Sequence, residues 1–198
     1  MKLSDFMDMS HLQKIQDTFS QATGLAVIAV DMDGNYITRE SGFTDFCTKQ
    51  TQGCQEGARR CQKCTAAGQG VYECHAGLME FSIDIVLNGE KLGHLTGGQV
   101  FSREPDEEKL AALAEELELD PNAYVRAAQK VPVRTEPSIR AAVSLLNDMV
   151  NILIVQEYMS ATEYKKIHDP KRNVVVTDSS KKIPKNSKAS PPNRRSWR

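Results

Sequence analysis

Several kinds of segment are missing from this sequence of 198 residues. No apolar run approaches the eighteen residues that a membrane-spanning helix needs, and the N-terminal segment MKLSDFMDMS has acidic residues where a secretory signal needs an apolar core. We therefore expect a cytoplasmic protein without membrane contact. The sequence also has no glycine-rich phosphate-binding loop, no pair of carboxylates at a telling spacing and no recognisable nucleophile–base triad. These absences favour a protein that is not an enzyme.

Charge is unevenly distributed along the chain. The formal net charge is −1, yet residues 165–198 carry eleven Lys and Arg against two Asp, which leaves a balance of −10 on the rest. The basic segment is rich in Lys, Ser, Asn and Pro, so we predict one domain over residues 1–160 and a disordered tail over 161–198. Trp197 is the only aromatic residue near its end, and no DNA-reading motif precedes it. We do not expect a nucleic-acid partner.

The first forty residues indicate a helix followed by a hairpin. Leu12, Ile15 and Phe19 have helical spacing, which predicts a helix over residues 10–22 with Ser10 as its N-cap and Gly24 as its C-terminal stop. The apolar segment 25–30, the turn DMDG at 31–34 and the segment NYIT at 35–38 predict two strands joined by a tight turn.

A second hairpin is expected in the middle of the chain. Residues 71–86 are typical of a strand, Asn88-Gly89 is a strong hairpin turn, and residues 91–101 supply the returning strand. Gly97 and Gly98 interrupt the returning strand. They predict a bulge, or a place where a ligand, another strand or a helix comes close to the backbone.

Three helices are expected to follow. Two short ones lie at about 106–117 and 120–128, the second with Asp120 as N-cap and Pro121 at its first position. A longer third helix should begin within residues 135–138 and run to about 160. Its main apolar stripe consists of residues spaced by three and four: Ile139, Val143, Leu146, Met149, Val150, Leu153 and Ile154. Further apolar residues widen that stripe: Leu145, Ile152, Val155 and Met159.

Such a helix can cover its own domain with one face and meet a partner helix with another. We predict a homodimer formed through it, and we expect charged residues at Leu146 and Leu153 to abolish association. The alternative is a terminal helix that packs only on its own sheet.

All five cysteines lie between residues 47 and 74, in a stretch that predicts loops with short helices. Because cytoplasmic disulfides are rare, these thiols are better explained as metal ligands, as redox- or ligand-responsive groups, or as buried apolar groups. The residues Cys47, Cys61, Cys64 and Cys74, with Cys54 or His75 nearby, could supply the thiolate-rich set that suits zinc or an iron–sulfur cluster. We also expect the positive charges of Arg59, Arg60 and Lys63 to lower the pKa of nearby thiols.

Polar residues of the predicted strands could line a small ligand pocket, together with the two glycines. The candidate ligand-binding residues are Tyr72, His75, Asp84, His94, Gly97, Gly98 and Gln99. Taken singly, each of the polar side chains also has an ordinary structural explanation.

Several of these segments together resemble the PocR sensory domain, a PAS-like ligand-binding module of prokaryotic signalling proteins. The resemblance covers the chain from about residue 8 to about residue 155. The motifs that carry it are LQKIQDTFSQATGLAVIAVDMDGNYIT, FC at 46–47, RRC at 59–61, VYECHAGLMEFSIDIVLNGEKLGHLTGGQVF and DPNAYVRAAQKVPV. By position, the residues that fall on the family's cysteines, HAGL and GGQ motifs are Cys47, Cys61, Cys74, His75 and Gln99. Cys54 and Cys64 are additional to that pattern.

The resemblance implies an α+β fold with a PAS-like antiparallel sheet flanked by helices. It also implies a small ligand, such as a short alcohol, a diol or a similar hydrocarbon derivative, and a transcriptional, kinase or cyclase output. No helix-turn-helix, kinase or cyclase signature follows residue 160. Either the output lies in a partner, or the chain is a fragment.

The leading hypothesis is thus a non-catalytic sensor whose cysteine-bearing loop and sheet enclose a small ligand or a metal. Occupancy of the site would be relayed through the long helix to a signalling or transcriptional partner. One alternative is a thiol-based redox switch or enzyme that uses Cys61 and Cys64, which requires an abnormally acidic thiol. The other is a dimerising adaptor module.

Overall fold

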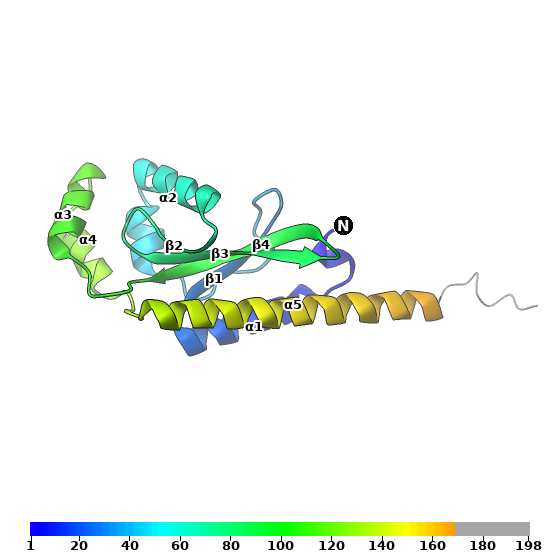
Figure 1. Ribbon diagram of the computed structural model, residues 1–198. Coiled ribbons are helices and arrows are strands. Elements are labelled where there is room, and N and C mark those ends of the chain that lie inside the picture. Colours follow the sequence, from blue (N-terminus) through cyan, green and yellow to red (C-terminus); the bar gives the residue numbers. More distant parts are fainter. Residues whose placement is uncertain (169–198) are drawn as a thin grey trace, which may run out of the picture.

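A four-stranded antiparallel sheet lies at the centre of the computed structural model, which describes residues 1–168 (Figure 1). The spatial order is β1 (Ala26–Asp31), β4 (Glu90–Val100), β3 (Met79–Leu87) and β2 (Gly70–Glu73). Helices lie on both faces, so the expected α+β fold with a flanked antiparallel sheet is confirmed. The hairpin at Asn88-Gly89 is also confirmed, since both residues have the positive φ that this turn needs (52° and 82°).

One face of the sheet is covered by α1 (Met9–Thr23) and α5 (Glu136–Ile167), which run beside each other beneath it in Figure 1. α1 extends one residue beyond the predicted range at each end, and Gly24 terminates it in the left-handed conformation as expected. The N-cap is Asp8 and not Ser10, because the Asp8 carboxylate accepts a hydrogen bond from the Ser10 backbone N–H at 2.9 Å. The main core lies here, where Leu12, Phe81 and Leu95 are fully enclosed.

α5 begins at Glu136, within the predicted interval, and continues to Ile167, beyond the expected end near residue 160. Its inner face is buried on the sheet and comprises Ile139, Val143, Leu146, Val150 and Ile154. The four residues that widened the predicted stripe lie on the outer face and are exposed: Leu145, Ile152, Val155 and Met159. Met149, which was predicted as part of the main stripe, is also exposed there. Leu146 is therefore a core residue, and a charge there would disrupt the fold itself. Figure 1 shows the C-terminal part of α5 projecting past the sheet.

α5 is also the one helix among residues 1–168 that is long and apolar enough to cross a membrane, with a mean hydropathy of 1.5 over eighteen residues. A helix that covers the core of a domain passes the same test, so this is weak evidence for a span.

A second, smaller core forms at one end of the sheet. It joins η2, a short π-helical segment (Phe46–Thr51), to α3 (Glu107–Glu116) and α4 (Pro121–Ala128). Asp120 caps α4 and Pro121 occupies its first turn, as predicted. The buried Tyr124 packs on Phe46, and its hydroxyl oxygen lies 3.1 Å from the hydroxyl oxygen of Thr51.

Three stretches differ from the prediction. Residues 35–38 form no strand, because Tyr36 makes only an isolated bridge to β1. The stretch predicted as one strand over 71–86 is two strands, since a turn in which Gly77 donates to the Cys74 carbonyl reverses the chain between β2 and β3. The cysteine stretch contains a thirteen-residue helix, α2 (Gln55–Ala67), where only short helices were expected.

Gly97 and Gly98 lie where β4 passes between its two neighbours. A Cβ atom on Gly97 would meet the Ala26 carbonyl oxygen of β1 at 2.0 Å, and one on Gly98 would meet the Met79 carbonyl oxygen of β3 at 2.3 Å. The sheet register shifts beside them, between Met79 and Phe81. The predicted irregularity is confirmed, and the groups that come close to the glycine backbone are adjacent strands.

Candidate functional site

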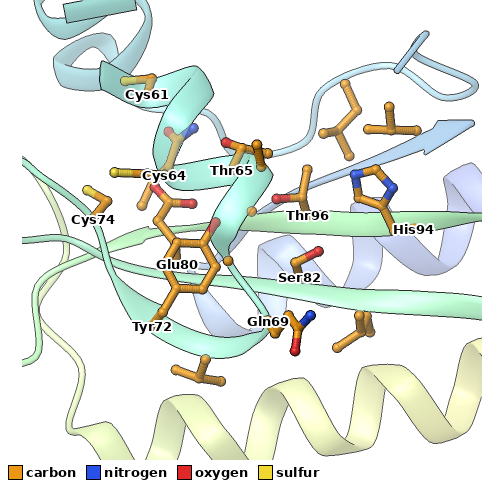
Figure 2. A pocket seen from close by; sticks show the side chains of 18 of the residues that line it. Cys61, Cys64, Thr65, Gln69, Tyr72, Cys74, Glu80, Ser82, His94 and Thr96 are labelled. Atoms are coloured by element: carbon orange, nitrogen blue, oxygen red, sulfur yellow. The ribbon is translucent and has the colours of Figure 1, made fainter. Parts of the chain in front are cut away.

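The second face of the sheet is the floor of a cavity of about 1420 Å³ beneath α2. Side chains alternate along a strand, so the residues that do not enter the main core point into this cavity. They form cross-strand sets in register: Tyr72 with Glu80, Ser82 with Thr96 and Ile28, and Asp84 with His94 and Val30. Figure 2 shows Cys61, Cys64 and Thr65 on α2 above this row of side chains.

α2 is capped at its N-terminus and joined to α3 by an ion pair. Cys54 is its N-cap, and the thiol sulfur accepts a hydrogen bond from the Gly57 backbone N–H at 3.3 Å. Arg60 pairs with Glu56 within the helix and with Glu116 of α3, both at 2.9 Å. Cys54 is therefore assigned a local capping role.

The loop from α2 into β2 closes one end of the cavity. A Cβ atom on Gly68 would lie 2.2 Å from two ring atoms of Tyr72, so the ring packs directly against this glycine. Burial raises the pKa of the Tyr72 phenol far above its ordinary value, and the charge of Glu80 adds to the effect. The neighbouring Val71 faces the other way and packs against the core between the sheet and α5. β2 thus contacts both the cavity and α5, and the hollow continues around this edge to polar residues of α5: Arg140, Ser144, Asn147 and Asn151.

Glu80 is the residue of this cavity that the sequence analysis missed. Its side chain projects from β3 beside Tyr72 and Cys74 in Figure 2, and burial raises the pKa of its carboxyl from 4.5 to about 8. Its carboxyl accepts a hydrogen bond from the Gln99 backbone N–H, and within residues 1–168 no cation pairs with it. An available signal was the polar alternation Glu80, Ser82, Asp84 between apolar residues of β3.

All five cysteines are unpaired, and three of those that line the cavity are weakly acidic thiols: Cys47, Cys61 and Cys74. Burial raises the pKa of Cys47 to about 12 and that of Cys61 to about 11, and the charge of Glu80 contributes to both. Burial also raises the pKa of Cys74. The prediction that nearby positive charge would lower thiol pKa values is wrong for Cys61, because burial outweighs it and both Arg59 and Arg60 are engaged by Glu56. A nucleophilic Cys61 would need a lowered pKa, so this raised pKa disfavours the redox alternative.

His75 contacts one of these thiols. Its Nε2 lies 3.3 Å from the Cys61 sulfur, whereas its Nδ1 is buried without a hydrogen-bond partner in the described structure. Burial lowers the pKa of His75, so the neutral imidazole is favoured. A neutral ring nitrogen can accept a hydrogen bond from the Cys61 thiol.

Comparison with known proteins shows the family to which this chain belongs. The model of the sensory domain found in PocR matches residues 5–158. The chain belongs to this family. It is also similar to the regulatory protein PocR of Salmonella typhimurium strain LT2, with 39% identity over 97 residues. That match covers 45% of this chain and 32% of the relative, so it spans about a third of the relative's length. No solved structure matches. The family supports a sensory, regulatory role in place of catalysis.

The four predicted metal ligands of this PocR-type domain surround the cavity without converging. Cys47 comes from η2, Cys61 and Cys64 from α2, and Cys74 from the turn after β2. Among residues 1–168, no group of three or more His, Cys, Asp or Glu side chains is placed to hold a metal ion. The donors do not fit a coordination sphere in this arrangement, and zinc or iron–sulfur binding stays a prediction.

The remaining predicted ligand residues differ in their access to the cavity. His94 is partly buried in the wall, and burial lowers its pKa. Asp84 lies at the outer end, where Lys91 pairs with it at 2.6 Å. Gln99 is buried and structurally engaged, since its side-chain oxygen accepts a hydrogen bond from the Thr44 backbone N–H at 2.8 Å. Gly97 borders the cavity, whereas Gly98 faces β3.

Proposed function

We propose that this PocR-type domain is a non-catalytic sensor that binds a small hydroxylated molecule, such as a short alcohol or diol, in the cavity between α2 and the sheet. The observation that carries the proposal is the row of polar side chains that the strands place among apolar ones in the cavity wall, in particular Tyr72, Ser82 and Thr96. Small-molecule sites combine mostly apolar walls with a few placed polar groups. The family supports the sensory part of the proposal.

Binding without turnover is the property that tests this function. Ethanol and ethane-1,2-diol should raise the melting temperature in proportion to the logarithm of their concentration, and a ligand at 100 times its Kd stabilises the folded state by about 2.7 kcal/mol. The ligand should be recovered unchanged by NMR after long incubation. If neither compound shifts the melting temperature at concentrations up to the molar range, the ligand class is wrong.

We further propose that occupancy is relayed through α5 and that α5 pairs with the same helix of a second copy. The outer apolar stripe runs from Leu145 to Met159, a length of roughly 21 Å at the helical rise, and its members repeat at spacings of three and four. Ile152, at its centre, is 67% exposed. Two-fold pairing of one helix with its copy sets identical stripes against each other, which buries both.

The double substitution Ile152→Glu and Val155→Glu tests this pairing, because both side chains lie outside the core. We expect the mass in solution to fall from dimer to monomer with the far-ultraviolet circular dichroism retained. Lys130→Gln on the exposed surface beyond α4 changes the charge without touching α5 and should leave the dimer intact. A monomeric wild type at micromolar concentration would refute the proposal.

We also propose an output partner and a metal. The relative is a regulatory protein that extends beyond the matched segment, and we propose that this cytoplasmic sensor acts on transcription or signalling through a partner outside the sensory domain. Elemental analysis of protein purified without a metal-affinity tag tests the metal directly. About one equivalent of zinc or iron per chain would require the cysteine-bearing elements to rearrange from the positions described above.

A further inference from the structure

Glu80 is an acid placed in a cavity that gives it no ionic partner. Two basic side chains border the hollow, and each is already paired with another acid: Lys91 with Asp84 and Arg140 with Glu136, both at 2.6 Å. Glu80 stands opposite Tyr72 in the sheet register, on the side of the cavity nearest α2 and its thiols. Apart from the hydrogen bond that it accepts from the Gln99 backbone N–H, its carboxyl group has capacity for further hydrogen bonds with a ligand in the cavity.

The hydrogen bond from the Gln99 backbone N–H does not by itself explain an acid at this position. Burying a carboxyl group without an ionic partner opposes folding, and burial outweighs that hydrogen bond, since the pKa of Glu80 is raised to about 8. The alternation of β3 would accept an apolar residue at this position, because the flanking Met79 and Phe81 already anchor the strand in the core. Local violations of this kind are found at functional sites.

We propose that Glu80 is the specificity-determining residue of the cavity, and that it exchanges hydrogen bonds with a hydroxyl group of the ligand. This inference rests on the proposed function and adds a selection rule to it. A ligand must offer a hydrogen-bond donor to Glu80, so an ether of the same skeleton is not bound. A carboxylate in place of a hydroxyl is rejected, because no free cation borders the cavity in the described structure to balance a second negative charge.

Three probes built on a two-carbon backbone separate these requirements: ethane-1,2-diol, its dimethyl ether 1,2-dimethoxyethane, and glycolate. Wild-type protein should bind the diol and show at least tenfold weaker affinity for each of the other two. Glu80→Met retains the approximate side-chain volume and removes both hydrogen-bonding roles. We expect it to weaken diol affinity by roughly 10- to 100-fold, the range expected for hydrogen bonds to a carboxyl group.

The readout that distinguishes recognition from structure is the melting temperature without ligand. Glu80→Met should leave it unchanged or raise it, because an unpaired buried acid is removed. Glu80→Gln keeps a donor and an acceptor in the same place and should recover part of the affinity. The matched control is Glu73→Met, which replaces an exposed acid on β2 that does not line the cavity and should change neither quantity.

The possible outcomes distinguish a failure of this inference from a failure of the proposed function. If wild-type protein binds none of the probes, the proposed ligand class and the role of Glu80 are both overturned. If it binds the diol and Glu80→Met binds equally well, only the role of Glu80 is overturned. A Glu80→Met variant that loses stability and keeps its affinity would make Glu80 a structural residue.

Discussion

Replacing Glu80 with Gln should stabilise the domain, and increasingly so at higher pH. Burial raises the pKa of Glu80 from 4.5 to about 8, so the folded protein retains a proton that the unfolded chain has lost at any pH between these values. Unfolding therefore releases a proton, and the wild type loses stability as the pH rises through this window. Glutamine does not ionise, so the variant does not lose this stability as the pH rises.

The size of the effect follows from the same values. Each unit by which the pKa differs between the folded and unfolded states is worth about 1.4 kcal/mol of stability. The full rise in the pKa of Glu80 therefore sets an upper limit of about 5 kcal/mol. Protein relaxation and solvent penetration generally weaken such burial effects, so we expect about half of this limit. Glu80→Gln should thus gain about 2 kcal/mol of stability relative to wild type between pH 5 and pH 9.

Urea unfolding at a series of pH values, under reducing conditions, measures the difference in the free energy of unfolding between variant and wild type. The lowered pKa values of His75 and His94 destabilise both proteins equally at acidic pH, so they cancel in the difference. Glu73→Gln on the exposed side of β2 serves as the control. Parallel stability curves for Glu80→Gln and wild type would show that Glu80 is ordinarily solvated, and the reasoning about its burial would be wrong.

Three further outcomes are expected. Cys47 and Cys61, with pKa values of about 12 and 11, should react with iodoacetamide at pH 8 on the order of 100-fold more slowly than in the unfolded chain; rapid alkylation of Cys61 in the folded protein would restore the redox hypothesis. Leu146→Ala should cost about 2–5 kcal/mol because its side chain is fully enclosed, whereas Met32→Ala in an exposed turn should stay within about 0.5 kcal/mol in the same denaturation assay. Gly68→Ala should cost about 1–3 kcal/mol and weaken diol binding, since its Cβ would displace the Tyr72 ring; unchanged stability and affinity would mean that the ring moves freely.

The elements with strong local signals were predictable from the sequence. Asp120-Pro121 and Asn88-Gly89 encode a helix start and a hairpin in the residues themselves, and both are found where expected. The stretch 71–86 was misassigned as one strand because the turn after Cys74 depends on a single positive-φ residue, Gly77, within an otherwise strand-like composition. Local propensity alone does not reveal such a reversal.

The site was harder to predict because its members are adjacent only through the sheet register. Tyr72 and His94 were predicted as ligand-binding residues one at a time, from their polarity alone, and in the structure both line the same cavity. Glu80 was overlooked because an acid within a strand is ordinarily solvent-facing, and only the position of α2 over β3 encloses it. The two faces of α5 posed the same problem: helical spacing identified the apolar residues, but only the docked sheet distinguishes buried Leu146 from exposed Leu145.

The interlocked glycines of β4 give the cavity a stiff floor. The backbone at Gly97 and Gly98 packs directly against Ala26 and Met79, and β4 is hydrogen-bonded to a neighbouring strand on each side, so we expect the central strands to move little. Any change in the volume of the cavity's contents must then be taken up by its roof, α2, and by the loop at Gly68 that leads into β2. Since Val71 of β2 packs on the core beneath α5 and β2 contacts α5, we expect movement of the roof to reach α5 along this edge of the sheet.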